Sequence, residues 1–543
     1  MKHLKRYKFD AAMSRLLLAL VASMATISAG AASPEQARLL VGIMVDGLDA
    51  DQLDLLRERF GQGGFKLLEQ QGVSLTADYG TYLDPTASTA TIFTGAAPST
   101  SGIGSDTNFD RRTLRKSPAY ADKDVLGNFS STGYSPKSLR VSNLADEARI
   151  ASGGTNNIYS IAATPGLAIS MAGHNATSAL WLDHKTGNWA SSTAYPEMPI
   201  AVATRNRAVP LNTRLDTMSW TPSLAPADYP ALPDHLTRYP FRYVFPRANS
   251  ERLDMFAASP MYNREVSSLA GELIVNHKLG KNEGVTDVIN IAFNLQPFNY
   301  GKSTDKRVEL QDAYIKLDRN LEQLFSTISR HVGLDHAVIM LASTPPRPNR
   351  RRDDERFNLP YGEFSAKKAA SLLNLYLIAL HGNGAYVSHF TNGNIYLNHK
   401  LLEEMKLDIS AVRAEAAKLL ASMTGVDRVH TLDDIIAGRA GENAEALRRN
   451  TVVSAAGDLL VEVAPGFEII EDFNESSPTA GHTGMVQCTA AATAPVFILA
   501  PNVAAQTIGT PVDARSIAPT VARILRIRSP NGAAAPALVL TKK

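Results

Sequence analysis

The sequence has little cysteine and almost no net charge. Its single cysteine, Cys488, excludes a framework of intramolecular disulfides. Lysine and arginine total 55 against 53 for aspartate and glutamate, so no overall basic field points to nucleic acid. With 44% apolar and 20% charged residues among 543, the chain is neither wholly disordered nor a multi-span membrane protein. This length allows two or three domains, or one large α/β domain with insertions.

Long apolar runs are also missing beyond the amino terminus, where residues 1–31 resemble a secretory signal peptide. A basic stretch ending at Arg15 precedes an apolar run from Leu16 to Ile27, and Ala29-Gly30-Ala31 is typical of a cleavage site. The alternative is a membrane anchor, but a span needs about 20 residues. We therefore expect a periplasmic or secreted bacterial protein whose mature chain has no membrane span.

Buried strands alternate with helices along the rest of the chain. Apolar runs typical of buried parallel strands lie at Leu39–Val45, Val285–Phe293, His336–Ala342 and Ala494–Ala500. Helical patterns lie at Val308–Val332, Ile409–Met423 and Ile517–Ile527. This alternation predicts an α/β fold with a mostly parallel central sheet and helices on both faces. We expect one domain over residues 36–543, with peripheral insertions at about 111–264 and 346–465, where the pattern weakens.

Two polar residues stand where such a sheet forms its sites, at the carboxyl ends of the strands. Asp46 ends the first strand, and Thr86 stands where a helix begins. A metal shared by this carboxylate and this hydroxyl would make the hydroxyl a nucleophile, and the helix terminus would favour a phosphate oxygen. The alternatives are a turn at Asp46-Gly47 and a helix N-cap at Thr86. From these residues alone, both interpretations stay open.

The segments around these residues resemble the alkaline phosphatase superfamily, and most of all the bacterial periplasmic phosphatases of its type I phosphodiesterase and nucleotide pyrophosphatase branch. They are Gly42-Ile-Met-Val-Asp46-Gly47, Pro85-Thr86-Ala87 and Ile92-Phe-Thr-Gly95-Ala-Ala-Pro98-Ser-Thr-Ser-Gly102-Ile103. The resemblance runs from about residue 38 to 540. It implies an alkaline-phosphatase-like fold and a centre with two zinc ions, in which Asp46 is a ligand and Thr86 the nucleophile.

Most other residues that the resemblance implies are replaced in this chain. The positions of the family's remaining zinc ligands are occupied by Pro297, Gly301, Thr344, Pro345 and Thr493. The positions of its phosphate-binding lysine, arginine and asparagine fall on or near Thr164, Gly166 and Asp106. Zinc requires histidine nitrogen, thiolate or carboxylate ligands. We therefore expect no zinc and vestigial roles for Asp46 and Thr86.

Other residues are weaker candidates for such a site. Ser303-Thr304-Asp305 resembles a metal-ligand step but lies late, with Glu309 where histidine is needed. His482 is interpreted as a loop residue, and His174 as a satisfied buried imidazole.

An arginine-rich loop follows directly after the altered positions 344 and 345. Its arginines, which could hold an anion by forked hydrogen bonds, are Arg347, Arg350, Arg351, Arg352 and Arg356. The alternative is a solvated loop balanced by its own three acids.

These observations favour a non-catalytic binding or scaffolding protein with a degenerate zinc site, no cofactor, and an unknown protein or anionic partner. The first alternative is a metal-dependent phosphatase or phosphodiesterase with a non-standard metal site, which would hold two zinc ions. The second is a metal-free anion-binding protein. Fold alone does not decide between them.

Overall fold

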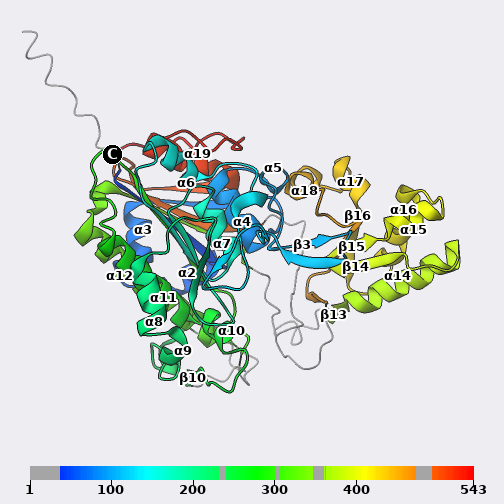
Figure 1. The fold of residues 1–543 in the computed structure, drawn as a ribbon, viewed down its shortest axis with the longest axis horizontal. Coiled ribbons are helices and arrows are strands. Elements are labelled where there is room, and N and C mark those ends of the chain that lie inside the picture. Colours follow the sequence, from blue (N-terminus) through cyan, green and yellow to red (C-terminus); the bar gives the residue numbers. More distant parts are fainter. Residues whose placement is uncertain (1–36, 231–239, 301–305, 347–359, 361, 472–491) are drawn as a thin grey trace, which may run out of the picture. The chain divides into compact units, whose positions relative to one another are not determined.

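The computed structural model describes residues 37–230, 240–300, 306–346, 360, 362–471 and 492–543, and a ten-stranded sheet is its central element (Figure 1). The strands lie in the order β20-β2-β19-β12-β1-β11-β6-β7-β8-β5. Their bounds are β1 Leu39–Asp46, β2 Val73–Asp78, β5 Gly127–Asn128, β6 Ile158–Ala162, β7 Ser178–Leu182, β8 Trp189–Ser192, β11 Asp287–Asn294, β12 Ala337–Ser343, β19 Thr493–Leu499 and β20 Gln506–Asp513.

The middle of the sheet is parallel. Strand β1 pairs in parallel with β11 and β12, and β6 pairs in parallel with β11 and β7. Strand β19 is antiparallel to both of its neighbours, β12 and β2, so it starts at the edge where β1 and β12 end. The predicted mostly parallel α/β fold is therefore confirmed. The ends of β1, β11 and β12 and the start of β19 lie at the same edge of the sheet.

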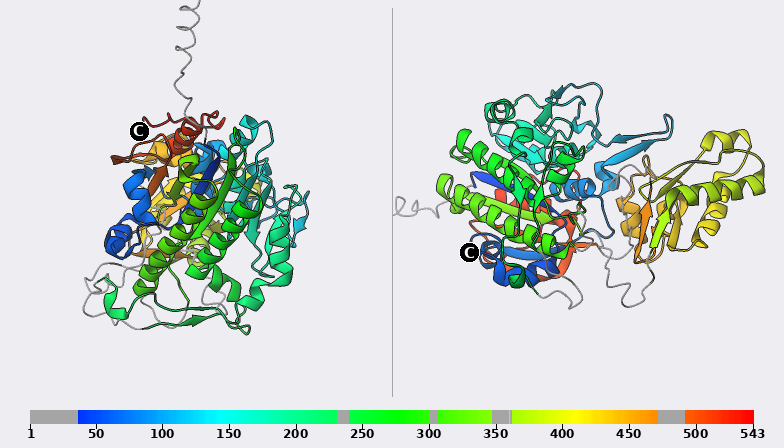
Figure 2. Two further views of the ribbon diagram at one scale, coloured as in Figure 1. Left: turned by 90° about the vertical axis from the view of Figure 1, so that its left-hand side faces the viewer. Right: turned by 90° about the horizontal axis from the view of Figure 1, so that it is seen from below.

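Helices cover both faces of the sheet, as predicted. Side chains of β1 alternate between two apolar cores, with Val41 and Ile43 in one and Leu40 and Met44 in the other. The first core includes α2 (Ala50–Leu56), α3 (Phe65–Gln71), α8 (Ile200–Ala208), α9 (Leu211–Arg214), α10 (Arg252–Ala257), α11 (Pro260–Asn276) and α12 (Arg307–His331). The second includes α4 (Pro85–Thr94), α6 (Leu144–Ala151), α7 (Pro165–Ala172) and α19 (Ile517–Leu525). Figure 2 shows α11 and α12 side by side.

The segment at about 111–264, predicted to be peripheral, supplies β5, β6, β7 and β8 to the central sheet. Strands β6 and β7 are buried at every residue. Each is only five residues long and contains a serine, so neither presents the long apolar run by which β1 and β12 were predicted. This segment also forms the small β9–β10 pair (Ser219–Trp220 and Tyr243–Val244).

The second segment builds a sheet of its own, in the order β14-β15-β17-β16. Its strands are β14 Val387–Thr391, β15 Asn394–Leu397, β16 Val426–Thr431 and β17 Leu459–Val463, and its helices are α14 Ala366–His381, α15 His399–Glu404, α16 Ile409–Ala421, α17 Leu432–Ile436 and α18 Ala444–Asn450. Strands β13 (Gly362–Ser365) and β18 (Phe467–Ile470) pair beside them. Leu373, Leu420 and Val461 belong to a separate apolar core. We call residues 362–470 the peripheral domain.

A hairpin of β3 (Thr107–Asp110) and β4 (Arg115–Pro118), which follows the short helix α5 (Pro98–Ser101), contacts the peripheral domain. The ring of Phe109 stacks on His389 with 4.7 Å between ring centres. The Arg111 Nη1 atom lies 2.7 Å from Oδ2 of Asp458, whose side chain is fully buried. These contacts connect the chain just after Asp106 to the peripheral domain. Within the part of the chain that the structure describes, no helix is long and apolar enough to cross a membrane.

Candidate functional site

Asp46 lies at the end of β1, between β11 and β12, and neutral side chains hold its carboxylate. Its Oδ1 accepts a hydrogen bond of 2.6 Å from Thr344 Oγ1 and one of 2.9 Å from Gln296 Nε2. Gln296 follows β11 by two residues and Thr344 follows β12 directly, so both partners come from the neighbouring strands. Thr344 Oγ1 in turn accepts from Gly47 N at 2.9 Å. The three strand ends are therefore joined by hydrogen bonds around one carboxylate.

The structure confirms the predicted turn at Asp46-Gly47. Gly47 has a φ of +84°, which glycine adopts without strain, and it turns the chain directly after Asp46. A Cβ atom at this position would lie 3.0 Å from Gln296 Nε2. The turn therefore brings the backbone close to the amide that binds Asp46.

Thr86 is the second residue of α4, and its side chain is also bonded. Asp84, not Thr86, is the N-cap: its Oδ1 accepts from Thr86 N at 2.8 Å, so the N-cap interpretation of Thr86 is wrong. The residue is 2% exposed, and its Oγ1 donates a hydrogen bond of 3.0 Å to Asp106 Oδ1. Burial raises the pKa of Asp106, and the hydrogen bond from Thr86 opposes part of that rise.

Both positions at which the resemblance implies cations are neutral, and Gly166 lies close to this pair. A Cβ atom on Gly166 would lie 2.5 Å from Asp106 Oδ1 and 2.6 Å from Thr86 Oγ1. Thr164 is the N-cap of α7, and its side chain accepts from Leu167 N at 3.4 Å. The missing side chain at Gly166 therefore leaves the space that the Thr86–Asp106 contact occupies.

The described residues around Asp46 and Thr86 do not fit the two zinc ions that the resemblance implies. Zinc in proteins is held by three or four ligands drawn from histidine, cysteine and carboxylate groups. The neighbours of Asp46 are instead one amide and one hydroxyl. Across the described ranges, no three His, Cys, Asp or Glu side chains form a group that could hold a metal ion.

The remaining sequence-predicted residues divide into two groups. Among the described ones, Pro297 and Pro345 follow β11 and β12, and Thr493 is the first residue of β19. Gly301, Ser303-Thr304-Asp305, His482 and the arginines Arg347, Arg350, Arg351, Arg352 and Arg356 lie outside the described residues.

Glu309 and His174 have other partners. Glu309 is buried on α12 and accepts from the Tyr243 hydroxyl at 2.7 Å. His174 Nδ1 lies 2.9 Å from Asp146 Oδ2, and its Nε2 lies 2.9 Å from the Leu139 carbonyl oxygen, so both ring nitrogens are satisfied, as predicted. Its side chain is 34% exposed, however, and so is not fully buried as predicted.

Sequence reasoning missed two residues of this site. Asp84 could have been found, because an acidic residue directly before a proline at a helix start is an N-cap signal. Gln296 follows a predicted buried strand, but the resemblance directed attention to Pro297, the next residue. Its contact with Asp46 joins residues 250 positions apart and depends on strand order.

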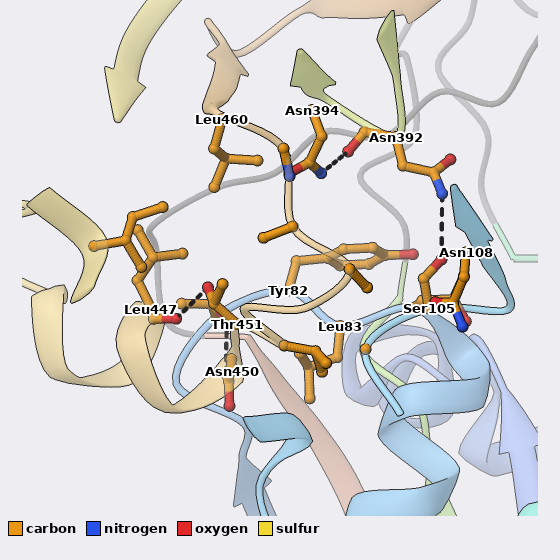
Figure 3. Close-up of a pocket in the computed structure, with 18 of the residues that line it drawn as sticks. Tyr82, Leu83, Ser105, Asn108, Asn392, Asn394, Leu447, Asn450, Thr451 and Leu460 are labelled. Carbon is orange, nitrogen blue, oxygen red and sulfur yellow. Dashed lines mark hydrogen bonds between the residues drawn. The ribbon is translucent and has the colours of Figure 1, made fainter. Parts of the chain in front are cut away.

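A cavity of about 120 Å³ beside the start of α4 was also not predicted (Figure 3). Its wall includes Tyr82, Leu83 and Asp84 just before α4, and Ser105 and Asn108 near β3. The peripheral domain contributes Asn392, Asn394, Tyr396, Leu447, Asn450, Thr451 and Leu460 to the wall. Thr86, Asp46 and Thr344 do not line it.

Comparisons with known proteins show which family the chain belongs to. Residues 40–486 match the family model of type I phosphodiesterase / nucleotide pyrophosphatase. The chain is similar to a calcium-transporting ATPase of Myroides odoratus, with 26% identity over 92% of this chain and 93% of the relative. It is also similar to alkaline phosphatase PafA of Elizabethkingia meningoseptica, with 24% identity over 91% and 93%.

The crystal structure of wild-type PafA superposes on this chain with a TM-score of 0.79 at 21% identity, covering 93% of this chain and 98% of that one. At this identity the likeness shows the fold, which is that of the alkaline phosphatases. The match to the family model spans most of the chain. The chain therefore belongs to the type I phosphodiesterase / nucleotide pyrophosphatase family of the alkaline phosphatase superfamily.

Proposed function

We propose that this chain is a non-catalytic member of its family, in which hydrogen bonds from neutral side chains to Asp46 replace the zinc centre. The observation that carries the proposal is the environment of Asp46. Because Thr344 Oγ1 accepts from Gly47 N, its own proton is directed to Asp46 Oδ1, which also accepts from Gln296 Nε2. Zinc would find only this one carboxylate here, because Thr344 and Gln296 offer it no histidine nitrogen and no second carboxylate.

The surroundings of Thr86 support the same proposal. A threonine hydroxyl is a weak nucleophile unless a base or a metal activates it. Asp106 accepts a hydrogen bond from its hydroxyl, but Thr164 and Gly166 provide no positive charge for a phosphate ester. The carboxylates of Asp84 and Asp106 both accept hydrogen bonds from Thr86. Their negative charges would repel a phosphate bound at Thr86. We therefore propose a binding or scaffolding role for the chain instead of catalysis.

A second candidate is a phosphoric ester hydrolase with a non-standard site, and the comparisons favour it over the first. The family is named for phosphodiesterases, and a relative that aligns over 91% of the chain is an alkaline phosphatase. In this candidate Thr86 is the nucleophile and Asp106 accepts its proton. Any metal ligands besides Asp46 would have to come from residues such as Asp305 and His482.

An activity assay separates the two candidates. We would measure hydrolysis of para-nitrophenyl phosphate and bis-para-nitrophenyl phosphate, with and without added zinc, by the wild type, Thr86→Ala and His482→Ala. The non-catalytic proposal expects all three at the level of a protein-free blank. Turnover by the wild type that disappears in Thr86→Ala would overturn it in favour of the hydrolase, and a loss of both turnover and bound zinc in folded His482→Ala would indicate a metal ligand.

A further inference from the structure

We propose that the cavity beside the start of α4 is a binding site for a neutral saccharide ring. Its walls come from three parts of the chain: the residues just before α4, the segment that leads into β3, and the peripheral domain (Figure 3). Pockets enclosed by separate segments in this way are preferred places for small ligands. Because Thr86 and Asp46 do not line the cavity, the proposal does not depend on whether Thr86 is catalytic.

The chemistry of the wall is neutral and polar. The carboxamides that line it belong to Asn108, Asn392, Asn394 and Asn450. Hydroxyl groups are supplied by Ser105, Thr107 and Thr451, and the acids of the wall are Asp84 and Glu462. Among the described residues of the wall there is no lysine, arginine or histidine. Phosphate and carboxylate ligands therefore have no counter-charge here, and the two acids disfavour them.

Carboxamides suit hydroxyl groups because each side chain both donates and accepts hydrogen bonds. The Asn394 amide is fixed: its Nδ2 donates to the Asn392 carbonyl oxygen at 2.9 Å and its Oδ1 accepts from Gly457 N at 3.0 Å. Asn450 Nδ2 donates to Tyr79 O at 2.9 Å and to Thr81 Oγ1 at 2.8 Å, bonds in which its amide oxygen takes no part. The orientation of these polar groups is therefore set before a ligand arrives, which lowers the entropy cost of binding.

Other polar groups of the wall are held less tightly. Asn392 Nδ2 reaches Ser105 Oγ at 3.3 Å and Thr107 Oγ1 at 3.4 Å, both long for hydrogen bonds. The Asn108 side chain makes no hydrogen bond to another described residue. A ligand hydroxyl can therefore bond to the Asn108 side chain without breaking a hydrogen bond of that side chain to another described residue.

Two tyrosine rings, Tyr82 and Tyr396, complete the wall. The Tyr396 hydroxyl donates to Ala455 O at 2.8 Å, Phe109 packs against its ring with 4.5 Å between centres, and the Arg111 guanidinium lies 4.9 Å from the ring centre, so this ring is fixed. The half-buried Tyr82 is therefore the ring that a ligand would contact. Rigid aromatic rings accompanied by a few polar groups are typical of small-molecule pockets. A sugar ring has an apolar face of C–H groups and a rim of hydroxyls, and it matches both features of the wall.

The cavity is small. A cavity of about 150 Å³ holds a benzene molecule, and this one measures about 120 Å³ with an open side. A hexose is larger than benzene, so only part of a single sugar ring would lie inside the cavity and the rest would stay in solvent. A nucleoside, with two ring systems, is a poorer match.

The test is a binding measurement with the full chain, by ligand-observed NMR and calorimetry. The probes are glucose, galactose, mannose and N-acetylglucosamine, with glucose 6-phosphate and adenosine as comparisons. We expect at least one neutral sugar to bind, and its affinity to fall about tenfold in Asn108→Leu, the scale of one lost hydrogen bond in a buried site. We expect glucose 6-phosphate to bind more weakly than glucose.

Matched variants guard against a folding defect. Asn282→Leu places the same substitution on an exposed loop outside the cavity and should bind like the wild type. Ser105→Ala is a smaller change in the wall and should also weaken binding. The proposal is overturned if none of the four sugars binds the wild type, if adenosine binds more tightly than all of them, or if folded Asn108→Leu and Ser105→Ala both bind like the wild type. None of these readouts involves phosphatase activity, so failure here is distinguishable from failure of the proposed function.

Discussion

Thr86 Oγ1 donates a hydrogen bond of 3.0 Å to Asp106 Oδ1. The hydroxyl at the nucleophile position is thereby directed to a carboxylate whose burial raises its pKa. Neither residue is paired with a lysine or arginine among its described contacts. The contribution of this hydrogen bond to stability can be measured separately from activity.

Asp106→Asn should stabilise the protein at neutral pH by about 1 kcal/mol, because the amide avoids the cost of burying a charge and still accepts from Thr86. The folded-state pKa of Asp106 lies above its unfolded value, so the folded state binds the proton more tightly. Wild-type stability from this group is therefore present at low pH and lost as pH rises through the folded pKa. Denaturant unfolding of both proteins should show a difference that shrinks below about pH 4. A wild type more stable than the variant at pH 7 would contradict this.

Gly166→Ala should destabilise the protein by about 1–3 kcal/mol, the usual cost of overpacking a filled site. Its Cβ would come within 2.6 Å of both Thr86 Oγ1 and Asp106 Oδ1. Gly271→Ala on α11 is the matched control, since the nearest atom to its added Cβ is 4.0 Å away. The control should gain up to about 1 kcal/mol, because alanine is favoured over glycine inside a helix. Equal unfolding free energies for the two variants would show that the contact at Gly166 is not tight.

Asp458→Asn should destabilise the protein by about 3 kcal/mol, because it removes one of the two carboxylates that pair with the buried Arg413. Burial alone would raise the pKa of Asp458, but hydrogen bonds from His399 and Arg111 outweigh it and hold the pKa well below its usual range. With the folded pKa depressed, this stability is present above about pH 4, the unfolded value, and is lost as pH falls toward the folded pKa. Wild-type unfolding should therefore show an acid-side loss that Asp458→Asn lacks.

The same network predicts a difference between adjacent arginines. Arg111 bonds to Asp458 and to Ala456 O at 2.8 Å, whereas Arg112 is exposed. Arg111→Ala should raise hydrogen exchange in β3 and lower stability, and Arg112→Ala should change stability by less than about 0.5 kcal/mol. Identical exchange in the two variants would mean that Asp458 does not anchor the hairpin.

The central strands and long helices were predictable because their sequences carry the signal. Strands β1 and β12 are covered on both faces, so they read as continuous apolar runs, and α12 has its apolar residues on one face. The short strands β6 and β7 carry no such run. Strand β6 joins the sheet by pairing with β11, more than 100 positions away, and β7 joins it by pairing with β6. The order of the strands in the sheet could therefore not be predicted from the pattern of apolar residues.

The sequence predicted where the candidate site lies but not which side chains contact one another there. A strand end and a helix start identified Asp46 and Thr86, and the resemblance pointed to Thr344 and Asp106 as altered positions. Which donors would turn toward Asp46 was not predictable, because Gln296 reaches it only through the register of β1 and β11. The cavity likewise combines three distant segments, none of which carries a motif for it.

The zinc content of the purified chain tests most directly whether hydrogen bonds have replaced a zinc centre at Asp46. We would incubate the wild type and Asp46→Asn with zinc, remove free metal by gel filtration, and measure zinc per chain by elemental mass spectrometry. We expect far less than one zinc ion per chain, equally in both proteins, because the side chains around Asp46 donate hydrogen bonds and supply no set of zinc ligands. One or two firmly held zinc ions in the wild type that are lost in Asp46→Asn would contradict it.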